Sequence, residues 1–220
     1  MTKDIEWIVS NSIEPYIDSI NKMENWVLDI KEGNGKEKIW LLEHDDIFTL
    51  GTSGNESEVI NNGNIKIVQT GRGGKVTYHG PGQRVIYIML NLKKRMREFD
   101  IRKYVYLLEC WIIDSLKEIG INGEVREGRI GIWVKTPGKN LPFEEAKIAA
   151  IGIRVKQGIS YHGVAINIHP DLNKFKQIIP CGLKEFGVTS LSDLNKKITM
   201  LDFDKILKNK FENFIQQISS

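Results

Sequence analysis

Three stretches of this sequence place apolar residues three or four positions apart, and short β-rich segments separate them. The stretches cover residues 16–30, 101–119 and 201–218, and their spacing is that of a helix with an apolar face. The segments between them are rich in Val and Ile and are separated by turns that contain glycine. A chain with this order of elements is predicted to adopt an α+β (mixed α/β) fold.

Local signals set the expected ends of these elements. The first helix follows Pro15 and ends at Gly33-Asn34-Gly35, and the second begins at Asp100, a good N-cap residue. Strands are expected at 39–43, 47–50 and 65–69, with several more between 125 and 168. Residues 135–145 are expected to form a loop, because Pro137, Gly138 and Pro142 interrupt regular structure.

Length and charge exclude several classes of protein. The 220 residues suit a single domain, 1–220. Since 31 Lys and Arg face 28 Asp and Glu, the net charge of +3 offers no global field for nucleic acid or an anionic membrane. No apolar run approaches the ~20 residues of a membrane helix, and the first ten residues lack the apolar core of a signal peptide. Two cysteines suit a reducing compartment, so a cytoplasmic protein is expected.

The densest glycine run is GRGGKVTYHGPGQ, residues 71–83. Glycines allow a backbone to approach a ligand closely and to direct its N–H groups at an oxygen. The run matches neither a dinucleotide-binding fingerprint nor a Walker A loop. A pair of tight hairpin turns is an alternative, but Arg72 and His79 within the run favour a binding loop.

Two further residues are candidate catalytic groups. Lys147 leads into an apolar strand-like run, where it is either a solvated strand end or a partly desolvated base that also lowers the pKa of a nearby thiol. Cys181 lies between Pro180 and Gly182, and a turn of this kind exposes a thiol that can act as a nucleophile. Cys110 lies within the second helix and is expected to pack as a small apolar residue.

Two histidines are candidate bases. His162 stands in Tyr-His-Gly and His169 precedes a proline. Each is alternatively a hydrogen-bonded scaffold histidine, and this alternative suits His169 better than His162.

Taken in order, the motifs LLEH, TLG, RGGKVTYHGPGQ, GIWV, KIAAIGIRV, YHGVAINI, PCG and VTSL closely resemble the lipoyl(octanoyl) transferases. The resemblance covers about residues 39–192. It implies a biotin/lipoate protein ligase catalytic-domain-like fold with a mixed β-sheet flanked by helices, over about residues 33–217.

The resemblance also assigns roles to residues. Cys181 matches the nucleophile that forms an acyl thioester, and Lys147 matches the dyad partner that lowers the pKa of the thiol and shuttles protons. The matched substrate-binding residues are Arg72, Gly73, Gly74, Lys75, Val76, Thr77, Tyr78, His79, Ala150, Ile151, Gly152, Gly163, Val164 and Ala165. Small residues among them leave room for a straight C8 chain.

The implied reaction moves an octanoyl group from octanoyl-acyl carrier protein, through a Cys181 thioester, to a lysine ε-amine on a lipoyl domain. The implied partners are the carrier protein, lipoyl domains of 2-oxoacid dehydrogenase subunits and the glycine cleavage H protein. The acyl group arrives on phosphopantetheine, and neither ATP nor a metal is expected. A basic cluster (Lys93, Lys94, Arg95, Arg97, Arg102 and Lys103) is either a docking site for these acidic partners or a solvated face.

Two local departures from the family pattern stand outside the catalytic motifs. Residues 44–46 read His-Asp-Asp where a His-Pro-Pro type of turn is usual, and the 135–145 loop is a little long. Within the pocket motif, Ala150 replaces the serine of several members. They bear on loop shape and on the polarity of the pocket, not on the reaction.

Other functions remain open at the level of sequence. An ATP-dependent lipoate or octanoate protein ligase of the same fold would activate a free acid and need no cysteine. A related transferase would move octanoyl groups between lipoyl-bearing proteins. A non-catalytic module that binds acyl carrier protein would bind without transfer, and a thiol hydrolase would need a third residue to orient Lys147 or His162.

Overall fold

The computed structural model describes residues 4–136, 144–179 and 186–219. The elements within them are β1 (Ile5–Val9), α1 (Tyr16–Glu32), β2 (Glu37–Leu42), β3 (Ile47–Leu50), β4 (Lys66–Gln69), β5 (Val76–His79), β6 (Gln83–Met89), α2 (Leu92–Arg95), α3 (Ile101–Glu118), β7 (Gly123–Glu124), β8 (Ile132–Lys135), β9 (Glu145–Lys156), β10 (Ile159–Asn167), β11 (Gly187–Val188) and α4 (Met200–Ser219). Short 3₁₀ turns cover Glu56–Glu58 and Leu172–Gln177.

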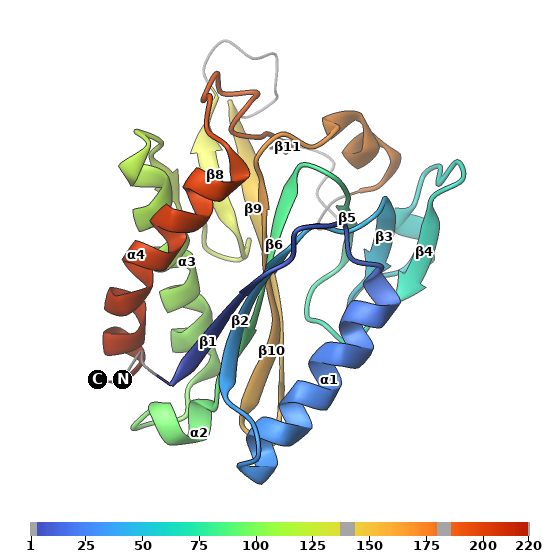
Figure 1. The fold of residues 1–220 in the computed structure, drawn as a ribbon. Coiled ribbons are helices and arrows are strands. Elements are labelled where there is room, and N and C mark those ends of the chain that lie inside the picture. The colour runs from blue at the N-terminus through green and yellow to red at the C-terminus, as the bar shows by residue number, and fades with distance from the viewer. Residues whose placement is uncertain (1–3, 137–143, 180–185, 220) are drawn as a thin grey trace.

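A mixed sheet forms the centre of the fold (Figure 1). Its strand order is β1-β2-β6-β10-β9-β8-β7, and β11 adds to β9. The β1–β2 and β9–β11 pairs are parallel, whereas the other neighbours in this sheet are antiparallel. A second sheet, β4-β3-β5, lies beside it. The α+β class and the mixed sheet flanked by helices are thus confirmed.

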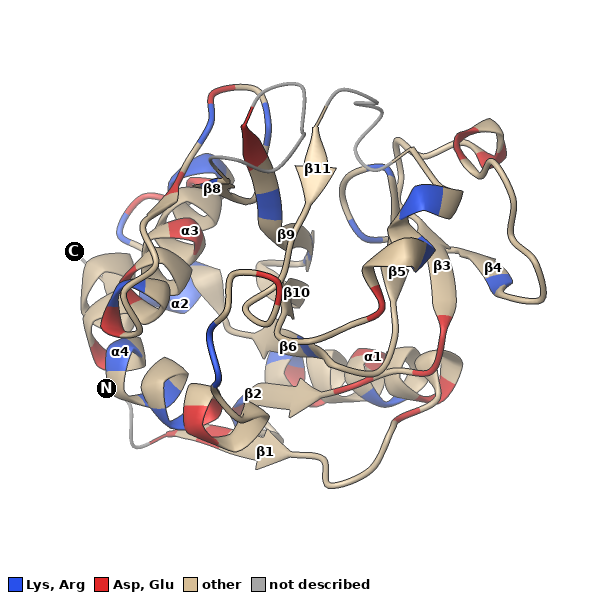
Figure 2. Cartoon of the chain, turned by 90° about the horizontal axis from the view of Figure 1, so that it is seen from above, with Lys and Arg blue, Asp and Glu red and all other residues tan. Residues whose placement is uncertain are grey.

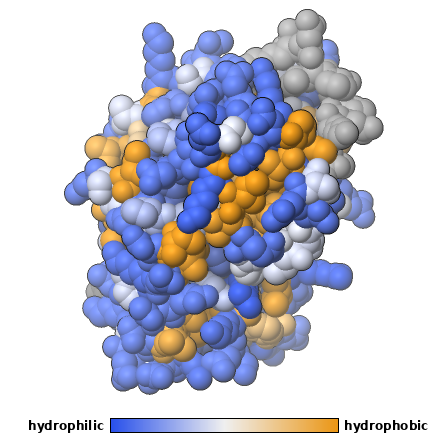
Figure 3. Space-filling model, turned by 90° about the vertical axis from the view of Figure 1, so that its right-hand side faces the viewer, coloured by the Kyte–Doolittle hydropathy of each residue, from blue (hydrophilic) through white to orange (hydrophobic). Residues whose placement is uncertain are grey.

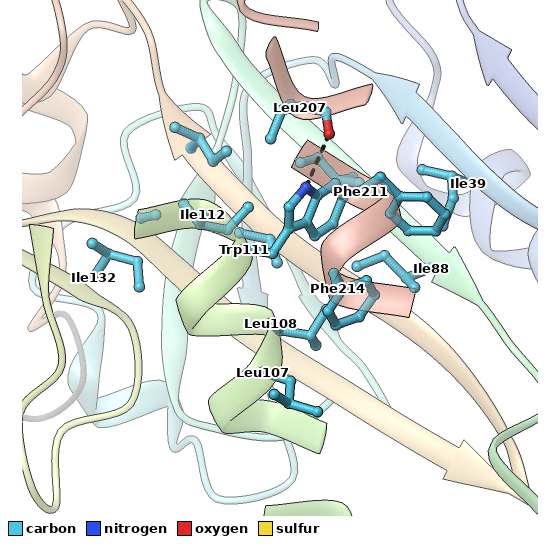
Figure 4. Close-up of a cluster of buried hydrophobic side chains, with 14 of the residues drawn as sticks. Ile39, Ile88, Leu107, Leu108, Trp111, Ile112, Ile132, Leu207, Phe211 and Phe214 are labelled. Carbon is cyan, nitrogen blue, oxygen red and sulfur yellow. Dashed lines mark hydrogen bonds between the residues drawn. The ribbon is translucent and has the colours of Figure 1, made fainter. Parts of the chain in front are cut away.

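Helices cover both faces of the central sheet (Figure 1). On one face, α3 and α4 bury a large apolar cluster in which Trp111 packs between Phe211 and Phe214 (Figure 4). The indole N–H of Trp111 donates to the Leu207 carbonyl over 2.9 Å, which pairs a buried polar group. On the other face, α1 packs Met23 and its apolar neighbours against β2, β6 and β10. Both faces of the sheet are therefore closed to solvent where the helices lie.

The predicted helices are confirmed with their end signals. The α1 helix follows Pro15, and Gly33 ends it with a left-handed φ of 80°. The Asp100 side chain caps α3 by accepting the backbone N–H groups of Arg102 and Lys103. The strands predicted at 39–43, 47–50 and 65–69 are β2, β3 and β4 within two residues at each end. Most of the predicted 135–145 loop lies outside the described residues.

The surface mixes charges of both signs. Acidic and basic residues are interspersed on α1 and α4 when the molecule is seen from above (Figure 2). On the side that faces right in Figure 1, apolar side chains form a diagonal band bordered by polar ones (Figure 3). Within the described ranges, no helix is both long and apolar enough to cross a bilayer.

The basic cluster lies at one end of the central strands. Lys93, Lys94 and Arg95 belong to α2, whose first residue donates its backbone N–H to the Gly158 carbonyl over 2.8 Å. Gly158 is in the turn that follows Lys156, the last residue of β9. Since Lys147 is nine residues earlier in β9, α2 lies about 30 Å from Lys147 along the strand. Docking of an acidic partner on this cluster stays a prediction.

Candidate active site

Lys147 lies near the start of β9 and is buried, with 6% of its surface exposed. Its backbone is paired on both sides, with Trp133 of β8 and with Val188 of β11. The Nζ atom donates to the Ile130 carbonyl over 2.9 Å and lies 4.9 Å from the centre of the Trp133 ring. Of the two alternatives that the sequence left open, the structure therefore shows a buried lysine and not a solvated strand end.

A cavity of about 390 Å³ extends from Lys147 between β9, β10 and the glycine-rich run. The predicted binding residues that line it are 72–77, 79, 150–152 and 163–165. Tyr78 is not among its lining residues, because its ring packs against Phe48 and Phe175 and its hydroxyl donates to Asp46 over 2.6 Å. Alternation along β5 explains this, since Tyr78 faces away from the side that His79 takes.

Arg72 fixes the shape of the glycine-rich run. Its guanidinium is buried and donates to the Thr49 carbonyl and hydroxyl and to the carbonyls of Gly73 and Lys75, at 2.6 to 3.1 Å. These bonds hold the backbone of Thr49, Gly73 and Lys75 in place around the Arg72 side chain. The arginine is thus built into the wall of the cavity, and its charge is compensated by oxygens rather than held ready in solvent.

Glycine is required where the run approaches β9. A Cβ atom on Gly152 would lie 2.9 Å from the Gly73 carbonyl oxygen, and one on Gly51 would lie 2.2 Å from the Gly74 oxygen. The Gly73 N–H donates to the Ile153 carbonyl over 3.1 Å, which ties the run directly to β9. The wall of the cavity thus forms where the backbone of the glycine-rich run comes close to its neighbours, as the glycines predicted.

Neutral histidines lie at the end of the cavity remote from Lys147. Burial lowers the pKa of His79 to about 3, helped by the charges of His44 and Arg72, and burial with Arg72 and Arg154 lowers the pKa of His162 to about 3. The Tyr16 ring stacks on His79 at 6.0 Å. At neutral pH these imidazoles are uncharged, so this end of the cavity suits an uncharged ligand.

His162 has an unusual backbone. Its φ is 58°, in the left-handed region, although it lies within β10. Successive strand residues normally point to opposite faces, but the Tyr161 and His162 rings stack at 5.0 Å with an interplanar angle of 26°. The backbone thus turns His162 onto the cavity wall. His162 pairs with Ile153, six residues along β9 from Lys147, which argues against His162 as the base for a group at Lys147.

The other candidates from the sequence take lesser roles. His169 is exposed and does not line the cavity. His44, in the His-Asp-Asp departure, is buried and bonds the Glu14 carbonyl and the Tyr87 hydroxyl, each over 2.7 Å. Cys110 is half-buried on α3, and burial raises the pKa of its thiol. Cys181 lies outside the described residues.

Comparison with known proteins places the chain in a family. A model described as the lipoyl protein ligase A/B catalytic domain matches residues 16–212. The octanoyltransferase of Parvibaculum lavamentivorans is 47% identical over 208 residues, which are 94% of this chain and 91% of that protein.

The chain belongs to the octanoyltransferases of this family. It is accordingly an acyltransferase, as the motif resemblance implied.

Solved structures share the fold at lower identity. A lipoate-protein ligase A bound with ATP superimposes with a TM-score of 0.69 at 14% identity, over 96% of this chain and 86% of that one. A biotin protein ligase from Aquifex aeolicus in complex with biotin and ATP gives 0.57 at 13% identity, over 99% and 72%. The predicted biotin/lipoate protein ligase catalytic-domain-like fold is thereby confirmed.

Several lining residues were not singled out by the sequence. They are Tyr16, Val85, Tyr87, Val105, Gly128, Arg129, Ile130 and Ile153. Tyr87 illustrates the reason: every residue of β6 is buried, so no alternation marks the face that meets the cavity. Tyr16 reads as an ordinary apolar helix position, and only the packing of α1 brings it to the site.

Proposed function

We propose that this octanoyltransferase carries an octanoyl group from octanoyl-acyl carrier protein to the ε-amine of a lysine on a lipoyl domain. The observation that carries the proposal is a buried lysine at the end of an apolar, acyl-sized cavity in a chain of this family. The lining is mainly apolar or small beside β9 and β10, as an alkyl chain requires.

Chain connectivity supports the pairing of Cys181 with Lys147. On one side of the 180–185 segment, the Ile179 N–H donates to the Glu58 carbonyl over 2.8 Å. On the other side, β11 begins at Gly187 and pairs with Ala146 and Lys147. Gly187 is six positions after Cys181 in the sequence. The chain thus returns to Lys147 directly after the proposed nucleophile.

The first half-reaction exchanges one thioester for another. The Cys181 thiolate attacks the carbonyl carbon of the donor, and the phosphopantetheine sulfur leaves and takes a proton. An adjacent Lys147 ammonium favours the thiolate and supplies that proton. Backbone N–H groups of the glycine-rich run are candidates for stabilising the tetrahedral oxyanion, a role whose loss costs ~10²-fold or more in rate.

The second half-reaction forms the product amide. The neutral ε-amine of the acceptor lysine attacks the Cys181 thioester, the amide bond forms, and the Cys181 sulfur leaves. Lys147, neutral after the first step, accepts the proton that the attacking nitrogen loses. The first step exchanges one thioester for another and the second runs downhill from thioester to amide, so we propose that neither ATP nor a metal takes part.

The partners follow from this chemistry. The donor is a phosphopantetheine-bearing carrier protein, and the proposed acceptors are lipoyl domains of 2-oxoacid dehydrogenase subunits and the glycine cleavage H protein. We place the reaction in the cytoplasm.

Intact-protein mass spectrometry tests the route. Wild type, Cys110→Ser and Cys181→Ser are mixed with octanoyl carrier protein without ATP, and a lipoyl domain is then added. One octanoyl adduct is expected on wild type and Cys110→Ser, with transfer to the lipoyl domain, and none on Cys181→Ser. Product that forms only with ATP and free octanoate would instead assign the chain to the ligase reaction.

A further inference from the structure

One peptide group lies between a buried carboxylate and Lys147. The N–H of Gly131 donates to Oε1 of Glu109 over 3.0 Å, and the carbonyl of Ile130 accepts from Nζ of Lys147 over 2.9 Å. The Ile130 carbonyl and the Gly131 N–H are the two ends of the same planar amide. A single peptide plane therefore connects a negative side chain on α3 with a positive one on β9.

The polarity of this chain of bonds is consistent along its length. The carboxylate accepts from the positive end of the amide dipole, and the ammonium donates to the negative end. Hydrogen bonds arranged in this order polarise and strengthen one another in a low-dielectric interior. The arrangement also fixes the direction of the 130–131 peptide, because rotating it would break both bonds.

Gly131 permits this geometry. Its φ is 122°, and a Cβ atom there would lie 2.6 Å from the Ala149 carbonyl and 3.3 Å from Cε of Lys147. A side chain at this position would push the peptide away from the lysine. Only glycine places the amide against β9 in this way.

Glu109 is an unusual residue for its place on α3. It is buried, with 4% of its surface exposed, on a helix whose other buried residues are mostly apolar. Burial raises the pKa of its carboxyl, opposed by the Gly131 N–H and by the charge of Lys147. Near Lys147, Arg129 lies over the same Trp133 ring and pairs with Glu145 of β9. Among the described residues, Tyr106 and Cys110, both on α3, also interact electrostatically with Glu109. Neither of them offers Glu109 a compensating positive charge.

We infer that Glu109 is a positioning residue for octanoyl transfer, which holds the Lys147 ammonium through the Ile130–Gly131 peptide. The inference rests on the role proposed for Lys147. The carboxylate of Glu109 fixes the Gly131 N–H, and the same peptide then presents its carbonyl to Nζ of Lys147.

The pH dependence of acyl-enzyme formation tests this role. Single-turnover rates with octanoyl carrier protein are measured from pH 6 to pH 10 for wild type, Glu109→Gln, Glu109→Asp and Glu118→Gln. In Glu109→Gln acyl-enzyme formation should slow about tenfold and its pH profile should change, because the peptide that holds Nζ of Lys147 loses its charged acceptor. The KM for the donor should not change. Glu109→Asp keeps the charge and should restore most of the wild-type profile.

The control is an exposed carboxylate on the same helix. Glu118 pairs with Lys210 on the surface over 2.7 Å, nine residues beyond Glu109. Glu118→Gln removes the same charge from α3 and should retain the wild-type profile. A Glu109→Gln profile that superimposes on wild type, in a protein with an unchanged melting temperature, would overturn the inference.

A further variant separates this inference from the proposed function. Lys147→Met should abolish the basic limb and slow acyl-enzyme formation at least 100-fold. Wild-type rates in Lys147→Met would refute the dyad itself, whatever Glu109 does. Slow rates in Lys147→Met with an unshifted Glu109→Gln profile would refute the role of Glu109 alone.

Discussion

At the scale of one residue, the shape of the proposed acyl site depends on the absence of a side chain at Gly152. Its Cα faces the Gly73 carbonyl across the cavity wall, and a Cβ would approach that oxygen to 2.9 Å and Cδ of Arg72 to 3.3 Å. Neither neighbour can yield cheaply, because the first is backbone and Arg72 is held by Thr49. A methyl group at this position must displace the glycine-rich run and so reshape the wall of the cavity.

We expect Gly152→Ala to change chain-length selectivity. The ratio of octanoyl to butyryl transfer should fall about tenfold, since one methylene in an apolar pocket is worth 10-fold or more in discrimination. Competition between octanoyl and butyryl carrier proteins, read by mass spectrometry, measures the ratio. Gly33→Asn, which alters a glycine with open space around it at the end of α1, is the control. An unchanged ratio in Gly152→Ala would mean that the chain does not pass this position.

Glu109 and Lys147 are a pair of buried charged residues close to the site. Both are charged residues in buried positions, and each interacts with one side of the same peptide group. Burying a charge is costly unless hydrogen bonds compensate it. Their placement is explained by function better than by stability, since a pair of apolar residues would pack there at lower cost.

At the scale of elements, α3 and α4 form the layer that supports β8 and β9 from behind the site. Trp111 is central to it, because it contacts Phe211 and Phe214 and bonds the Leu207 carbonyl (Figure 4). The same helix carries Glu109 and Val105 to the site. The packing of α3 on α4 therefore sets the position of residues that line or support the cavity.

Trp111→Phe should weaken this layer. The variant loses the indole N–H bond and part of the ring volume, so we expect the free energy of unfolding to fall by about 2 to 4 kcal/mol. Urea denaturation followed by circular dichroism measures the change. Tyr106→Phe, at an exposed position on the same helix, should alter the free energy by less than about 0.5 kcal/mol. Equal losses in the two variants would contradict the role given to the α3–α4 interface.

At the scale of the whole molecule, three buried histidines link stability to pH. The pKa of His44 is lowered to about 4, and the pKa values of His79 and His162 are lowered to about 3, in each case mainly by burial. In the unfolded chain these groups titrate near 6.5. Below that pH the unfolded state binds more protons than the folded state. The stability that the neutral histidines contribute is thus complete above about pH 6.5 and is lost as the pH falls toward their folded values.

We expect the melting temperature to fall steadily between pH 6.5 and pH 5. Each proton taken up only on unfolding changes the free energy by about 1.4 kcal/mol per pH unit. His79→Gln should reduce the slope of the free energy against pH by roughly a third, because it removes one of three such groups. Calorimetry across this range measures the slope. His169→Gln removes an exposed imidazole and serves as the control, and an unchanged slope in His79→Gln would contradict the linkage.

The sequence alone determined much of the element content and the chemistry of the site. Helix periodicity and end signals act over a few residues, so α1, α3 and α4 were predicted with their caps at Gly33 and Asp100. The motifs identified the family and the cavity-lining residues around 72–79, 150–152 and 163–165. Strands β1 and β6 were not predicted, and in β6 every residue is buried, so no alternation marks the strand.

Only the tertiary structure decided which of these residues meet. The pairing of β11 with β9 brings the chain after Cys181 to Lys147, and the packing of α3 brings Glu109 to the peptide that holds Lys147. The same strand order puts α2 at the far end of β9 and places His162 away from the lysine. Sequence patterns are local, whereas these contacts depend on strand order and on helix packing between residues far apart in the chain.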